Sequence, residues 1–274
     1  MMIFATGVCF SFSGILSKLT TWSPLTLVAG RGLLAAIILG IARRSFKPKL
    51  GRGEWIGAIG LCGTGLLFMF ANRLTTLANA IVLQYAMPIF VVLYCALVKR
   101  EKLQKVELFA VIVMISGVCL CFAEGLGGGS ILGDALALLS SVTYAALFLS
   151  ARYGDCDSLD MVYLGQLMAC CFLVFIPFDS GFSFTIQNLL VWLAMGTCLG
   201  VGYLLFALGM KGGISPLSAA VIANVEPVLN PTWAFLVLGE NPGTLAIIGA
   251  CIVLAAATMY SLLPIMNTKK CPQM

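Results

Sequence analysis

Two stretches of the chain repeat one pattern, and together they decide the fold. Residues 77–101 read LANAIVLQYAMPIFVVLYCALVKRE, and residues 216–240 read PLSAAVIANVEPVLNPTWAFLVLGE. In each stretch a proline stands thirteen residues before a glutamate. Upstream, residues 55–65 match residues 192–202 at one tryptophan and two glycines. The sequence therefore predicts a two-fold internal repeat.

The composition around this repeat is that of a membrane protein. Hydrophobic residues make up 61% of the 274 residues, charged residues only 10%, and the mean hydropathy is +1.05. A soluble domain carries roughly 25% charged residues. The net charge of +5 comes from short basic clusters between apolar runs, without a basic stripe beside stacking aromatics. We therefore expect an all-α integral membrane protein that does not bind nucleic acid.

Ten uncharged or nearly uncharged runs are long enough to span a bilayer, which takes about 20 residues of helix. Charged residues, glycine or proline separate these runs, since a charge at the bilayer centre costs ~2.5–3.5 kcal/mol. The predicted spans are residues 1–17, 24–42, 55–72, 77–98, 106–123, 131–151, 161–178, 189–210, 215–238 and 244–263.

The repeat divides these spans into two halves of five. We expect a first repeat at 1–124, a second at 131–264 and a tail at 265–274. Because five is odd, the second half enters the membrane upside down relative to the first. Inverted-topology repeats are typical of secondary transporters, which bind their solute near the midplane between the repeats.

Basic residues lie mostly in alternate connections, which predicts the orientation by the positive-inside rule. Thirteen Lys and Arg fall on the side of both termini: Arg43, Arg44, Lys47, Lys49, Arg52, Lys99, Arg100, Lys102, Lys105, Arg152, Lys211, Lys269 and Lys270. The other side holds only Lys18 and Arg73. We therefore expect both termini in the cytoplasm and the chain in the plasma membrane, as a bacterial inner-membrane protein.

Four segments carry a resemblance that covers nearly the whole chain. They are SPLTLVAGRGLLAA (23–36), residues 78–103, LGDALALLSSVTYAALFLSAR (132–152) and residues 215–242. The chain resembles the EamA-type ten-helix carriers of the drug/metabolite transporter superfamily. The first half departs from the pattern, with Met87 at the position of Glu226. The resemblance implies export of amino acids, other metabolites or toxic compounds, without naming the cargo.

Glu226 is the carboxylate deepest within an apolar run, about midway along the ninth predicted span. An ionisable group inside a membrane indicates a functional site. Burial of such a carboxyl favours proton uptake and release near neutral pH. Glu226 is therefore our candidate for a coupling proton, the alternative being a permanent pairing with no part in transport.

Prolines inside the fourth and ninth spans indicate interrupted helices at matching places in the two halves. Each proline lacks an N–H, so one carbonyl of the preceding turn loses its helical partner. Interrupted helices mark the solute site of many transporters. The candidates at and beside these breaks are Gln84, Pro88, Asn224, Pro227 and Asn230. A kink that only improves packing is the alternative.

Arg31 lies about two turns into the second span and at a height similar to that of Glu226, by the rise of an α-helix. An ion pair between them, or a shared site for an anionic solute, is geometrically allowed. The predicted cavity is lined by residues next to Pro88 and Pro227, with Arg31 and Tyr203 contributed by the second and eighth spans.

Other classes of protein fit less well. Most of the 11 cysteines lie in apolar runs, and the chain has no histidine, so we expect no metal, no cofactor and no enzyme activity. Two alternatives to a metabolite carrier stay open: a lipid-carrier flippase and a membrane scaffold that transports nothing. The substrate, the coupling ion and the oligomeric state are not determined by the sequence.

Overall fold

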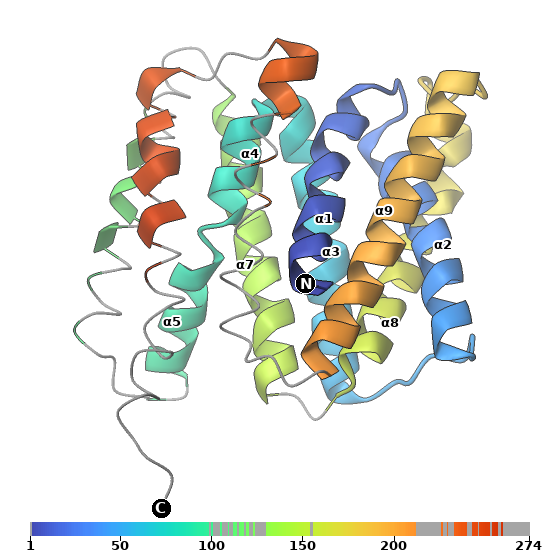
Figure 1. Ribbon diagram of the computed structural model, residues 1–274, viewed down its shortest axis with the longest axis horizontal. Coiled ribbons are helices and arrows are strands. Elements are labelled where there is room, and N and C mark those ends of the chain that lie inside the picture. The colour runs from blue at the N-terminus through green and yellow to red at the C-terminus, as the bar shows by residue number, and fades with distance from the viewer. Residues whose placement is uncertain are drawn as a thin grey trace, which may run out of the picture.

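The structure is a computed structural model that describes residues 2–98, 100, 130–153 and 156–211, with individual residues between 105 and 123 and between 226 and 259. This part is helical and contains no strand. Its elements, shown in Figure 1, are α1 (Met2–Lys18), α2 (Pro24–Arg43), α3 (Arg52–Leu74), α4 (Leu77–Gln84), α5 (Met87–Leu97), α7 (Ile131–Tyr153), α8 (Ser158–Cys170), the 3₁₀ helix η1 (Cys171–Phe178), α9 (Ile186–Lys211) and the π-helix η2 (Ala234–Leu238).

Four segments of the described part are long and apolar enough to cross a membrane. They are Pro24–Arg43, Arg52–Leu74, Ser158–Phe178 and Ile186–Gly209. The prediction of an all-helical membrane protein is confirmed in this coarser form. The ends of the segments follow local capping, as at Ser23, whose side chain accepts from the N–H of Thr26 directly before Pro24 at the first helical position.

Several predicted spans differ from the helices. The span predicted at 77–98 consists of α4 and α5, with Tyr85 and Ala86 between them. The span predicted at 161–178 begins earlier, at Ser158, because Asp157 caps α8, and it changes to 3₁₀ geometry in η1. The span predicted at 215–238 lies mostly outside the described residues, and those predicted at 106–123 and 244–263 lie partly outside them.

Hydrogen bonds join the α1–α2 connection to the η1–α9 connection at one end of the bundle, which we call the Trp22 end. Thr21 Oγ1 donates to the carbonyl of Gly181 (2.7 Å), and Trp22 Nε1 donates to the carbonyl of Ser183 (3.1 Å). The C-terminus of α3 reaches the same end, where Arg73 donates to the carbonyls of Thr20 and Trp22. The start of α7 also lies at this end, because the hydroxyl of Thr75 donates to Asp134 (2.6 Å).

The opposite end, which we call the Arg43 end, joins the α2–α3 connection to the α7–α8 region. Asp160 accepts from Arg43 Nε (2.7 Å) and forms an ion pair with Lys49 (2.7 Å). Arg43 lies over the ring of Tyr163, whose hydroxyl donates to the carbonyl of Phe46 (2.9 Å). An aspartate at the start of α8 therefore fastens the α2–α3 connection.

These two ends fix the direction of each helix. Helices α1 and α3 run toward the Trp22 end, whereas α7 and α9 run away from it; α2 and α8 also run in opposite directions. Figure 1 shows the same alternation, with α1 rising from the N-terminus and α9 descending beside it. Helices α1, α2 and α3 thus run in directions opposite to those of α7, α8 and α9, respectively.

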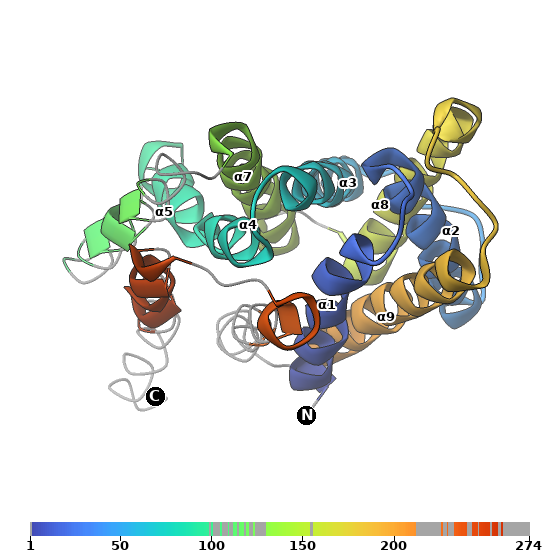
Figure 2. The same cartoon turned by 90° about the horizontal axis from the view of Figure 1, so that it is seen from above.

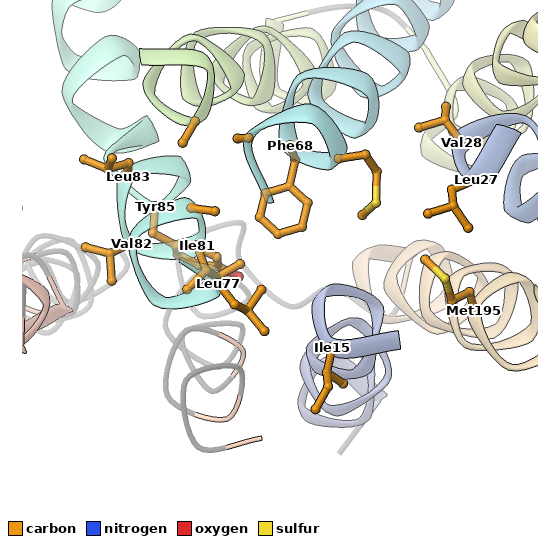
Figure 3. Close-up of a cluster of buried hydrophobic side chains, with 14 of the residues drawn as sticks. Ile15, Leu27, Val28, Phe68, Leu77, Ile81, Val82, Leu83, Tyr85 and Met195 are labelled. Atoms are coloured by element: carbon orange, nitrogen blue, oxygen red, sulfur yellow. The ribbon is translucent and has the colours of Figure 1, made fainter. Parts of the chain in front are cut away.

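Helix α3 packs against α7 and α8, while α9 packs against α1 and α2, and α2 also contacts α8. Figure 2 shows α3 beside α7, and α9 beside α1 and α2. The largest buried cluster joins side chains of α1, α2, α3, α4 and α9, including those of Ile15, Val28, Phe68, Ile81 and Met195 (Figure 3). Both halves of the chain therefore contribute to one core.

Close contact between α3 and α7 depends on Gly60. A methyl group there would lie 2.8 Å from the carbonyl oxygen of Thr143 and 2.9 Å from the nitrogen of Leu147, both backbone atoms. We expect Gly60→Ala to cost about 1–3 kcal/mol through overpacking, which exceeds the gain in helix propensity. Gly63→Ala is the matched control, since its methyl would meet only the side chain of Thr143, at 3.2 Å. Thermal unfolding in detergent measures both; equal melting temperatures would contradict the predicted contact.

The environment of Asp179 at the Trp22 end leads us to expect that the protein loses stability in acid. Burial alone raises the pKa of Asp179, but hydrogen bonds from Thr26 (2.5 Å), the Ser23 N–H (2.8 Å) and the Gly181 N–H (2.9 Å) outweigh it and lower the pKa below its ordinary value. The lowered pKa contributes stability that is present above the unfolded value of about 3.9 and is lost as the pH falls through the folded value.

The measurement compares melting temperatures of the wild type and Asp179→Asn across pH. We expect a constant difference between pH 7 and 5 that shrinks below about pH 4. A difference that persists unchanged at the lowest pH would show that the charge of Asp179 contributes nothing.

Candidate functional site

The fourth predicted span is interrupted near its middle. Helix α4 ends at Gln84, and the N–H of Ala86 bonds to the carbonyl of Leu83 (3.2 Å), three residues back, instead of to that of Val82, four residues back. Pro88, in the first turn of α5, has no N–H for the carbonyl of Gln84. The interruption predicted from Pro88 is present, and it places Tyr85 at the break.

Glu226 lies against this break. The hydroxyl of Tyr85 donates to Glu226 Oε2 at 2.8 Å. Tyr144 of α7 meets the ring of Tyr85 edge-on, with ring centroids 6.4 Å apart. Tyr144 and Tyr203 both lie within electrostatic reach of the Glu226 carboxylate. Tyr85 at the α4–α5 junction therefore contacts the carboxylate of Glu226, and the phenol groups of Tyr144 in α7 and Tyr203 in α9 interact with it electrostatically.

Arg31 is buried among three helices of the first half. Its Nη1 donates to Ser13 Oγ of α1 (2.9 Å), and its Nη2 donates to the carbonyl of Gly65 in α3 (3.4 Å). Within the part of the chain that the structure describes, Arg31 forms no ion pair with Glu226. Tyr203 interacts electrostatically with both groups.

A small cavity of about 20 Å³ lies beside Arg31, between α2, α3, α8 and α9. Its lining includes Arg31, Tyr203 and Gln166 of α8. The lining of this cavity contains none of the described residues next to Pro88. Glu226 and the broken helix thus form a separate group of side chains, connected to the cavity through Tyr203.

The remaining candidates have different outcomes. Gln84 is buried just before the break. Asn224, Pro227 and Asn230 lie outside the described residues. Tyr85 and Tyr144 were missed, although a phenol group next to Gln84 and Pro88, and another in the middle of an apolar run, could have indicated them. The contact of Tyr85 with Glu226 depends on packing between residues far apart in the sequence, which a helical pattern does not reveal.

The fold and this site define a class: a multi-pass membrane protein with ionisable and polar side chains gathered between its halves. The model of the EamA-like transporter family matches residues 1–123 and 131–262. The chain belongs to the EamA-like transporter family and is a membrane transporter of the drug/metabolite type. The resemblance found in the sequence is confirmed.

Two further comparisons found similar proteins. An uncharacterized transporter from Clostridium kluyveri is 27% identical, over 83% of this chain and 80% of that protein. A crystal structure that is 20% identical shares the fold with a TM-score of 0.69, over 97% of both chains.

Proposed function

We propose that the protein exports a small organic metabolite, such as an amino acid, by alternating access of one central site. In this proposal residues 1–124 and 131–264 form inverted repeats in the plasma membrane, followed by a cytoplasmic tail at 265–274. The observation that carries the proposal is the placement of Glu226 against the broken helix at Tyr85, between the two halves. A protonatable carboxyl at such a place can couple solute movement to a proton gradient.

The directions of the helices support the inverted repeat. If α1, α2 and α3 correspond to α7, α8 and α9, each pair of equivalents runs in opposite directions. The same correspondence exchanges the contact of α1 with α9 for that of α7 with α3, and the contact of α2 with α9 for that of α8 with α3. The α2–α8 contact maps onto itself. This pairing is what a two-fold axis in the membrane plane requires.

Charge supports the proposed orientation. The Arg43 end holds Arg43, Arg44 and the basic residues of the connection between α2 and α3, whereas Lys18 and Arg73 lie toward the Trp22 end. The positive-inside rule places the Arg43 end in the cytoplasm.

The experiment that tests the cargo is a thermal-stability screen of purified protein against amino acids and other metabolites. A ligand that binds the folded state raises the melting temperature as its concentration increases. We expect at least one such metabolite to stabilise the protein, and the same compound to be transported by reconstituted protein. Stabilisation by polyprenyl lipids alone would favour the flippase, and the absence of transport of any stabilising compound would favour the scaffold.

A further inference from the structure

Arg31 carries a buried positive charge that the described residues do not neutralise. Its side chain is 7% exposed, and both of its hydrogen-bond acceptors, Ser13 Oγ and the Gly65 carbonyl, are uncharged. The ionisable groups that interact with it are Tyr203 and Cys62. With ordinary pKa values of about 10 and 8.5, these groups are neutral at pH 7. A buried ion without a counter-charge is costly, so a negative group beside Arg31 would stabilise the folded protein.

The cavity beside Arg31 offers a place for that group. Its volume of about 20 Å³ holds roughly one water-sized particle. Gln166 lines it and is 2% exposed, and none of the described residues hydrogen-bonds to its side-chain amide. Gly65 leaves room for the guanidinium, because a methyl at this position would lie 2.8 Å from Arg31 Nη2.

We propose that Arg31, Gln166 and Tyr203 form a binding site for an anionic group. The guanidinium, the amide and the phenol each supply a hydrogen-bond donor to the cavity, and the guanidinium supplies the charge. Two sources have this chemistry: a small inorganic anion such as chloride, or the carboxylate of the solute. The second source rests on the proposed transport function, whereas the first does not.

The test is anion-dependent stability of purified full-length protein in detergent, at constant ionic strength set with sodium HEPES. Sodium chloride and sodium formate are the two probes. We expect at least one to raise the melting temperature of the wild type in a saturable way. Arg31→Gln should abolish this protection. Arg52→Gln, which removes an exposed arginine, should keep it.

Gln166→Leu is the sharper variant, since its amide has no described protein partner to leave unpaired. The variant should fold with a melting temperature near that of the wild type and bind the anion about tenfold or more weakly, through loss of a hydrogen bond to a charged group. If Arg31→Gln does not fold, the anion affinity of Gln166→Leu still tests the proposed site.

Protection by formate supports a carboxylate ligand, and protection by chloride alone supports an inorganic ion. Protection by neither probe, its persistence in Arg31→Gln, or an unchanged affinity in Gln166→Leu would overturn the proposal. Because the experiment measures binding in detergent, its failure leaves solute transport by reconstituted protein untouched, and a failure of transport leaves the anion site standing.

Discussion

Glu226→Gln is expected to reduce proton-driven solute flux in proteoliposomes to the level of empty vesicles, while the protein still inserts and purifies as one species. Glutamine keeps nearly the same shape and can still accept a hydrogen bond from Tyr85, but it cannot bind and release a proton. Severing a buried ion pair costs ~3–5 kcal/mol. Since Arg31 bonds to Ser13 and Gly65 instead of Glu226, we expect no such penalty here.

Tyr85→Phe is the matched control, because it removes the hydrogen bond to Glu226 and leaves the carboxyl in place. This variant should keep proton-driven flux at a reduced rate. Flux at the wild-type level in Glu226→Gln would exclude a coupling role for this carboxyl.

Asp160→Asn is expected to cause the largest loss of stability, about 3 kcal/mol or more. The side chains of Asp160 and Arg43 are each 7% exposed, so removing the carboxylate leaves the Arg43 guanidinium buried without its counter-charge. Lys49→Gln is the control on the same carboxylate, since Lys49 is 67% exposed and its ion pair is screened by solvent.

The measurement is thermal unfolding of the three proteins in detergent. We expect a clear decrease of the melting temperature in Asp160→Asn and a value near the wild type in Lys49→Gln. Similar values in both variants would show that Asp160 does not fasten the α2–α3 connection.

The sequence predicted the features that depend on local chemistry. Charge-free runs located the helices, and Pro88 located the break, because a missing N–H has the same consequence in any helix. Arg31 and Tyr203, both candidates from the sequence, line one cavity, whereas the predicted cavity beside Pro88 and Pro227 stays a prediction.

What the sequence could not give is which side chains meet across the bundle. Arg31 was a candidate partner of Glu226 because the two residues were expected at similar heights in the membrane. In the structure Arg31 contacts Ser13 and Gly65 on neighbouring helices instead. Rotation of each helix about its axis decides such pairs, and periodicity is a weak guide where helices are apolar on all faces. The Tyr85 contact with Glu226 could not be predicted for the same reason, because it joins residues that are 141 positions apart in the sequence.

Solute counterflow tests alternating access most directly. Proteoliposomes loaded with an unlabelled metabolite that stabilises the protein are diluted into a trace of the labelled compound, without an ion gradient. We expect a transient accumulation of label inside the vesicles, because one site exposed alternately to the two sides carries label in and mostly unlabelled compound out. Label that only equilibrates, or that enters protein-free vesicles as fast, would contradict it.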